Sequence, residues 1–336
     1  MNFLRRFSLQ LSPARQILLA AWFFITFANF SFWQAAFTAI GTDSWHNVLF
    51  LATLYLLLIT WLNQILSLLL LPWLLKPLLS ILLLGAATTA YFMDSYGVVI
   101  DREMIRNTLM TDPREAGELL SPKMALYLML LGVLPMVLVW RSKIHYASFM
   151  KEVGYKFLTL VVTLVISGGV AAAYYVDIAS FARNNTYIRH MIVPVNYVGA
   201  IESYIRSNLA GGKIVVAPLG EDAKKGAKIT SAGQKKVLTV IVVGEAARAS
   251  EFSLNGYARD TNPELSKLDI VNYRNVTSCG TETAVSVPCM FSKFTREDYS
   301  DSKAKRSENL LDVLKHAGFD LLWKDNNSSS RGVAVR

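Results

Sequence analysis

The sequence has no dense block of lysine and arginine, although its net charge is +9. Its basic residues lie at the edges of apolar runs and along the second half of the chain. Attraction to anionic lipid head groups explains that distribution, so nucleic-acid binding is not expected. Long apolar runs are also scarce beyond residue 180, since nearly all of them lie before it. The chain therefore divides into a membrane half and a soluble half of ordinary globular composition.

The membrane half contains five apolar stretches long enough to cross a bilayer, which takes about 20 residues. The first is too long for the apolar region of a cleaved signal peptide, and no small-residue cleavage site follows it, so we expect a retained anchor. Pro72 and Lys76 predict a tight hairpin between the second and third stretches. The stretches are 16–37, 48–71, 73–92, 124–140 and 157–175.

Basic residues orient these spans. Arg5, Arg6 and Arg15 precede the first span, whereas the loop 39–47 has no lysine or arginine. The positive-inside rule then places the N-terminus in the cytoplasm and the soluble half on the opposite side. In a bacterial inner membrane that side is the periplasm, where a disulfide persists. Acidic residues outnumber basic ones in the loop 93–122, which we expect to lie as an amphipathic helix on the outer membrane surface and touch the soluble half.

Two polar side chains, Asn63 and Gln64, fall inside the second span. They favour hydrogen bonding between helices over a path for substrate, although polar residues within spans can serve either purpose.

The soluble half begins with a linker, 178–236, in which a helical part is followed by an exposed loop. Its remaining part, 237–336, has two units that predict an α/β domain with a mostly parallel sheet. The run 237–245 is β-branched without alternation, as in a strand buried on both faces, and it ends at Glu245. Ligands of open α/β sheets bind beyond such strand ends, so Glu245 is either a functional carboxylate or a solvated loop residue.

The second unit is a helix that Ser307 can cap and Gly318 ends. A short apolar strand, 319–323, follows this helix, and the polar segment 324–327 comes directly after it. This arrangement again puts polar side chains at the carboxyl end of a strand.

The only two cysteines, Cys279 and Cys289, bracket a loop rich in hydroxyl groups. A disulfide between them would stabilise the fold by about 2–3 kcal/mol and hold those hydroxyls in place. A hydroxyl becomes a good nucleophile only beside a base or a metal. His190 and His316, the histidines of the soluble half, lie away from the loop, so a Zn²⁺ ion bound by Glu245 and a loop hydroxyl is the expected activator. The candidate nucleophiles are Thr277, Ser278, Thr281, Thr283 and Ser286.

Four segments resemble the phosphoethanolamine–lipid A transferases of Gram-negative inner membranes, the family that includes the polymyxin-resistance transferases. They contain Gly244-Glu245, Cys279-Gly280-Thr281-Glu282-Thr283 and Asp325-Asn326-Asn327. The resemblance covers essentially the whole chain, because the family also begins with five transmembrane helices. It implies an N-terminal five-helix transmembrane bundle (1–177) followed by an α/β periplasmic domain with an alkaline phosphatase/sulfatase-like fold. The segments are 243–248, 255–261, 278–292 and 323–328.

Residue roles carry over by motif. The resemblance implies that Thr283 is the nucleophile, that Glu245 and Thr283 bind zinc, and that Asn327 helps to bind the phosphoethanolamine group. Arg331 stands where the family often has lysine. Arginine keeps the positive charge, but its planar guanidinium group has a different geometry from the compact ammonium group of lysine. Thr281 is then a support of the loop. The implied reaction transfers phosphoethanolamine from phosphatidylethanolamine to a lipid A phosphate, through a covalent threonine intermediate.

The sequence departs from the family pattern in one respect. The family completes its zinc site with an Asp-His pair, and no Asp-His dipeptide occurs here. We therefore expect a C-terminally truncated polypeptide with little activity alone. Alternatives are a related membrane-anchored phosphoethanolamine or phosphoglycerol transferase with another acceptor, or a non-enzymatic membrane protein with a purely structural disulfide. We expect a monomer with membrane lipids as its partners.

Overall fold

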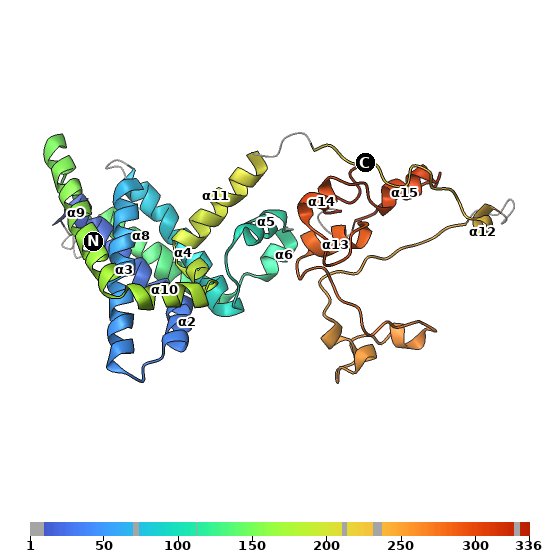
Figure 1. The fold of residues 1–336 in the computed structure, drawn as a ribbon, viewed down its shortest axis with the longest axis horizontal. Coiled ribbons are helices and arrows are strands. Elements are labelled where there is room, and N and C mark those ends of the chain that lie inside the picture. Colours follow the sequence, from blue (N-terminus) through green and yellow to red (C-terminus); the bar gives the residue numbers. More distant parts are fainter. Residues whose placement is uncertain (1–9, 70–73, 112, 210–213, 231–236, 326–329) are drawn as a thin grey trace, which may run out of the picture. The chain divides into compact units, whose positions relative to one another are not determined.

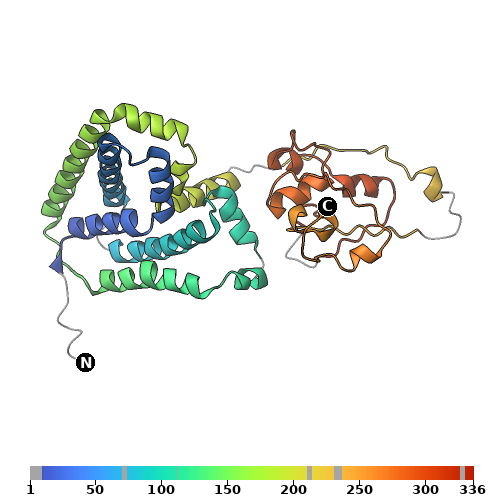
Figure 2. The same cartoon turned by 90° about the horizontal axis from the view of Figure 1, so that it is seen from below.

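The computed structural model describes residues 10–69, 74–111, 113–209, 214–230, 237–325 and 330–336. The chain forms two compact units, shown in Figures 1 and 2. The membrane unit comprises Met1–Leu109 and Pro113–Asn208, and the second unit comprises Met110–Asp112 and Leu209–Arg336. Each unit is described by itself.

Four helices of the membrane unit are long and apolar enough to cross a bilayer. They agree with the second to fifth predicted spans, because a run of about 20 apolar residues has few stable alternatives to a spanning helix. Figure 2 shows α4 beside the helix formed by α7, η2 and α8. The four are α3 (Trp45–Leu69), α4 (Leu75–Tyr96), the continuous helix Pro122–Arg141 made of α7 (Pro122–Tyr127), η2 (Leu128–Val133) and α8 (Leu134–Arg141), and α9 (Phe149–Ala173).

The first predicted span is broken into α1 (Pro13–Phe27) and α2 (Phe30–Ile40), which meet at an angle of 62°. The pair can count as a fifth span. The break lies at Asn29, which is buried and donates from Nδ2 to the Phe24 carbonyl at 2.8 Å. Such a bond offers the backbone an alternative to the helical ladder, which accounts for the bend that hydrophobicity alone does not predict.

Short elements connect the spans. Lys76, at the start of α4, donates to the Ser142 carbonyl at 2.7 Å, just past the end of α8, where a cation is favourable. The expected hairpin residue Pro72 lies outside the described residues.

A short parallel pair joins β1 (Gln10–Leu11) to β2 (Lys143–Ile144). The loop 93–122 contains the expected helix as α5 (Arg102–Met110), followed by α6 (Pro113–Glu118).

The helical part of the expected linker packs into the membrane unit. After α9 come α10 (Tyr175–Asn184), η3 (Ile188–Met191) and α11 (Val195–Leu209). Ile188, Val193 and Tyr197 belong to the same buried core as the spans. Burial of these apolar side chains explains why the segment returns to the bundle.

The second unit contains short helices and a small apolar cluster. Val287, Phe291 and Val333 are buried there, and Val243, Leu311 and Trp323 pack against them. We call these six residues the apolar cluster. The helices are α12 (Ala227–Thr230), η4 (Ala249–Glu251), η5 (Ser253–Asn255), η6 (Leu265–Lys267), α13 (Thr283–Phe291), α14 (Asp301–Lys305) and α15 (Leu310–His316).

The prediction of two strands in this unit is wrong for the described residues. Residues 237–245 and 319–323 belong to no β-ladder in the described parts of the chain. Their side chains are largely exposed, including Leu238 at 88% and Leu322 at 92%. A strand needs a neighbour to which its backbone is hydrogen-bonded. In the described parts of the chain, β pairing is found between β1 and β2 and at an isolated bridge between Ala217 and Ser307, and neither involves these two segments.

The helix predicted after Ser307 begins later than expected. Asn309 caps α15, because its Oδ1 accepts from the Leu311 N–H at 2.8 Å. Asp312 completes a capping box by accepting from the Asn309 N–H at 2.9 Å. The predicted end is confirmed, since Gly318 follows the helix with a φ of +81°, which favours glycine.

Candidate functional site

The hydroxyl-rich loop leads directly into α13. Thr283 is the first residue of this helix, whereas Thr281 is exposed just before it. The Glu282 carbonyl starts the helical ladder by accepting from the Val285 N–H at 2.9 Å and the Ser286 N–H at 2.8 Å. Thr283 is half-buried, so its hydroxyl lies at a fixed helix start rather than in a free loop.

The predicted disulfide between Cys279 and Cys289 is present, with 6.4 Å between their Cα atoms. It ties the loop before α13 to the far part of the same helix. Cys289 is buried, as are Ala284 and Val287 of the same helix. Thr283 therefore lies between two restraints, the disulfide at Cys279 before it and the packed helix α13 after it.

Glu245 follows the extended segment 237–243 and is half-buried. Val243, two residues earlier, packs against the apolar cluster. Ala246, directly after Glu245, has a φ of 54°, a conformation that side chains with a Cβ rarely adopt. The packing of Val243 before Glu245 and the unusual backbone conformation of Ala246 after it fix the position of this carboxylate. Unusual backbone conformations are often found at functional sites.

The apolar cluster brings together the segments that carry the predicted site residues. Val243 precedes Glu245, and Val287 lies one turn after Thr283 in α13. Val333 lies two residues after Arg331, and Trp323 precedes the predicted residue Asn327. The rings of Phe291 and Trp323 make an edge contact with centroids 5.4 Å apart. Asn327 itself lies outside the described residues.

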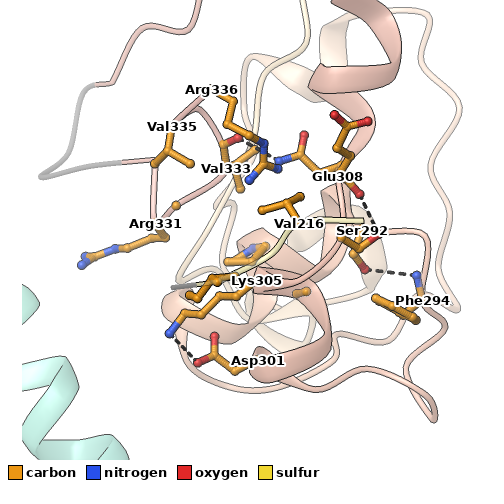
Figure 3. Close-up of a pocket in the computed structure, with 16 residues that line it drawn as sticks. Val216, Ser292, Phe294, Asp301, Lys305, Glu308, Arg331, Val333, Val335 and Arg336 are labelled. Atoms are coloured by element: carbon orange, nitrogen blue, oxygen red, sulfur yellow. Dashed lines mark hydrogen bonds and ion pairs between the residues drawn. The ribbon is translucent and has the colours of Figure 1, made fainter. Parts of the chain in front are cut away.

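Arg331 is the fourth predicted site residue. Its φ of 51° also lies in the left-handed region. Its Nη1 donates to the carbonyl of Met110 at 2.9 Å, a residue of the same unit. Figure 3 shows the Arg331 side chain directed away from Val333 and Val335. The structure thus gives Arg331 a defined backbone and a hydrogen bond to the protein backbone.

Arg331 lines a pocket of about 320 Å³ that the sequence did not indicate (Figure 3). Acid–base pairs surround it. Lys305 lies 2.9 Å from Asp301, and Arg336, in the wall, binds Asp312 with Nη2 2.6 Å from Oδ2. The capping pattern Asn309-x-x-Asp312 was the one sequence signal for part of this wall.

Two carboxyl groups here have lowered pKa values. The Leu219 N–H, 2.8 Å from Glu308 Oε2, and then His316, 2.9 Å from the same atom, lower the pKa of Glu308. Burial raises the pKa of Asp312, but hydrogen bonds from Arg336 and from the Asn309 N–H outweigh it, and the net pKa lies below its ordinary value. Both groups therefore favour the ionised form in the folded chain.

The expected zinc ion needs a group of ligands that lie close together. Among the described residues no three or more histidine, cysteine, aspartate or glutamate side chains form a group able to hold a metal. His316 pairs with Glu308, and His190 lies 3.2 Å from Arg189 Nε. A structural or catalytic zinc site takes three or four protein ligands. The described residues therefore do not form a complete zinc site, and Glu245 and Thr283 remain predicted ligands.

Two family models match the chain. One, described as "Phosphoethanolamine transferase EptA/EptB", matches residues 58–209, and the other, described as "Sulfatase", matches residues 238–334. Together they cover parts of both units. They support the predicted order of a membrane domain followed by a sulfatase-like domain.

Curated relatives match nearly the whole chain. "Phosphoethanolamine transferase EptA" of Escherichia coli (strain K12) is 38% identical over 322 residues, which cover 95% of this chain and 58% of that protein. "Phosphatidylethanolamine transferase Mcr-1" of Escherichia coli is 40% identical over 266 residues, covering 78% of this chain and 48% of that protein. The chain thus spans at most 58% of the length of these relatives.

A solved structure also matches. The integral membrane lipooligosaccharide phosphoethanolamine transferase A (EptA) from Neisseria meningitidis has a TM-score of 0.86 at 31% identity. The match covers 98% of this chain and 61% of that one. Together with the family models, it confirms the predicted fold class of apolar helices followed by a sulfatase-like domain, and it shows that the chain is a membrane protein.

Proposed function

The chain belongs to the EptA/EptB family of phosphoethanolamine transferases. We therefore propose that the protein transfers phosphoethanolamine from phosphatidylethanolamine to a phosphate of lipid A. The observation that carries this proposal is the start of α13, where a disulfide and a packed helix hold Thr283 in place. A helix start favours phosphate, because its backbone N–H groups and dipole attract negative charge. Thr283 therefore combines a nucleophilic hydroxyl with an environment suited to a phosphoryl group.

The proposed reaction has two displacements at phosphorus. In the first, Thr283 Oγ1 attacks the donor phosphorus, the bond from phosphorus to the glycerol oxygen breaks, and diacylglycerol leaves with the threonine proton. In the second, a hydroxyl oxygen of the lipid A phosphate attacks the same phosphorus, the bond to Thr283 breaks, and the proton of that hydroxyl passes to Thr283 Oγ1. The product surface carries less negative charge, so cationic peptides bind it less strongly.

We assign Glu245 as a zinc ligand in this protein, with Thr283 as a second. Zinc, when bound, favours the ionised hydroxyl and polarises a phosphoryl oxygen. Glu245 supports the assignment through its half-buried position and the unusual backbone of the next residue. The remaining ligands have to come from outside the described residues.

Two further residues are proposed to bind the transferred group. Arg331 supplies a fixed positive charge whose planar fork can bind two phosphate oxygens. Asn327 supplies an amide on the segment that follows Trp323. We further propose that the protein is a monomer in a bacterial inner membrane, with a cytoplasmic N-terminus and a periplasmic second unit.

The test is a search for the covalent intermediate. The protein, expressed from its complete gene, is incubated in vesicles that contain phosphatidylethanolamine, and its peptides are analysed by mass spectrometry. We expect a phosphoethanolamine group on Thr283, its loss in Thr283→Ala and its retention in Thr281→Ala. An adduct that persists in Thr283→Ala, or no adduct in the wild-type protein, would refute the proposal.

A further inference from the structure

The start of α11 is anchored inside the membrane unit. The buried Tyr197 donates its hydroxyl to the carbonyl of Leu82 at 2.7 Å. Leu82 lies within α4, one of the helices able to cross a membrane. Gly85 of the same helix makes room for the ring, because a Cβ there would lie 2.9 Å from Tyr197 Cε2. Tyr197 thus occupies a notch in the side of a spanning helix.

Neighbouring residues hold the same end of α11. Asn196 Nδ2 lies 3.4 Å from the sulfur of Met93, near the other end of α4. Val193, just before the helix, is hydrogen-bonded to Asn29 at the bend of the first span. Ala200 is buried one turn further on. One face of the first part of α11, from Asn196 to Ala200, is therefore packed against the protein.

A second face of α11 is apolar and exposed. Val198 and Ile201 are each 41% exposed, and Ile205 is 49% exposed. Their spacing of three and four residues puts them on one stripe of the helix. On the polar side of this stripe, Glu202 and Arg206 form an ion pair with each other. The helix therefore has three faces: one packed on protein, one apolar and one charged.

We propose that the stripe of Val198, Ile201 and Ile205 lies on the acyl chains of the bilayer, with α11 partly embedded in it. The stripe lies on a helix that Tyr197 anchors to Leu82, inside a helix long and apolar enough to cross a membrane, and Ile81, the residue before Leu82, is 66% exposed. At 15 residues, α11 is about 22 Å long, too short to cross the hydrocarbon core. An apolar face beside a charged face is the pattern of a helix held in the membrane interface.

The proposal is tested with a fluorophore attached to single cysteines, since the described cysteines are paired in the disulfide. Ile201→Cys and Ile205→Cys report on the stripe, and Arg206→Cys reports on the charged face. Ile81→Cys serves as the lipid-facing control and Glu221→Cys as the aqueous control. Each labelled full-length protein is placed in vesicles of phosphatidylethanolamine and phosphatidylglycerol. Quenching is measured with spin-labelled lipids and with aqueous iodide.

We expect labels at 201 and 205 to behave like the label at 81, with strong quenching by spin-labelled lipids and little by iodide. The label at 206 should be quenched more by iodide than either of them. Equal iodide quenching at 201, 205 and 221 would overturn the proposal. Shielding of 201 and 205 from both quenchers would also overturn it, because a protein partner or a second copy would then cover the stripe.

Discussion

The side-chain amide of Asn29 forms two hydrogen bonds with the backbone of Val193, a residue far along the chain. Oδ1 accepts from the Val193 N–H at 2.8 Å, and Nδ2 donates to its carbonyl at 2.9 Å. Both residues are buried. One side chain thus closes the bend of the first span and satisfies the backbone of the segment that leads into α11. A buried backbone group without such a partner would be costly.

Replacing Asn29 tests this arrangement. We expect Asn29→Ala to lower the free energy of unfolding by about 1–3 kcal/mol, because it leaves buried groups of Val193 without partners. The measurement is the thermal unfolding of the full chain in detergent. Asn184→Ala is the matched control, since Asn184 is exposed and bonds only to Ser180 among the described residues. Equal stability of the two variants would contradict the assigned role of Asn29.

The notch at Gly85 gives a second prediction. Gly85→Ala should destabilise the membrane unit by about 1–3 kcal/mol, because the new methyl group would overlap the buried ring of Tyr197. Gly168→Ala is the control, since nothing lies within 4 Å of a Cβ at that position in α9. It should be neutral or stabilising by up to about 1 kcal/mol through helix propensity. Melting curves in detergent would show the difference, and a neutral Gly85→Ala would argue against tight packing of Tyr197.

The disulfide should hold the start of α13 in place. We expect the double variant Cys279→Ser, Cys289→Ala to be less stable by about 2–3 kcal/mol, because the unfolded chain regains the freedom of the closed loop. Hydrogen exchange of α13, followed by mass spectrometry, should be faster in the variant. Adding a reductant should speed exchange in the wild-type protein and leave the variant unchanged. Unchanged exchange in the reduced wild-type protein would mean that packing alone holds the helix.

The acid pairs predict a loss of stability at low pH. The pKa of Asp312 is lower in the folded chain than its ordinary value of 3.8. The ionised Asp312 therefore stabilises the fold fully above pH 3.8, and this stabilisation is lost as the pH falls through the lowered pKa of the folded chain. Asp312→Asn should therefore cost about 1–2 kcal/mol above about pH 5, and this difference should shrink on acidification. Fluorine NMR of fluorotryptophan at Trp323 during denaturation can report on this unit. A difference that is constant with pH would exclude the ionised pair with Arg336.

The proposed metal ligand can be checked without an activity assay. Glu245→Gln removes a charged oxygen ligand and should lower the zinc content of the purified protein, expressed from its complete gene, as measured by elemental mass spectrometry. Glu251→Gln is the control, because Glu251 is an exposed glutamate of the nearby η4 that bonds to Ser250. Equal zinc content in both variants would remove Glu245 from the site.

The spans were the most predictable part of the fold, because lipid leaves a long apolar run little choice but a helix. The bend at Asn29 was missed, although a lone asparagine within an apolar run is a visible signal. Gln64 confirms the expected hydrogen bonding between helices, since it donates to Ser167 of α9 at 3.1 Å. Its neighbour Asn63 is buried, and neither of its amide atoms has a hydrogen-bond partner among the described residues.

The soluble half was less predictable. Strand prediction for 237–245 and 319–323 rested on local composition, whereas a strand forms only when another segment pairs with it. The start of α15 was placed at Ser307 because serine is a good cap, but Asn309 forms the capping box with Asp312. For the strands the local pattern predicted the wrong kind of segment, whereas for α15 it predicted the right kind of segment and the wrong capping residue.

For the candidate site, the sequence predicted the disulfide, and the structure contains it. It could not reveal that Val243, α13, Trp323 and Val333 meet in one apolar cluster, because such contacts join residues far apart in the chain. The pocket beside Arg331 was equally invisible, since its walls come from several separate segments. The roles of Thr283, Glu245, Asn327 and Arg331 stay predictions.

The apolar cluster also has a consequence for how the second unit folds. Its buried members Val287 and Phe291 need Val333, and its first member, Val243, is made long before Val333 leaves the ribosome. Contacts between such distant residues require closure of long loops, which slows folding. During synthesis Val287 and Phe291 therefore stay exposed until Val333 has been made, and we expect the chain to depend most on chaperones in this interval.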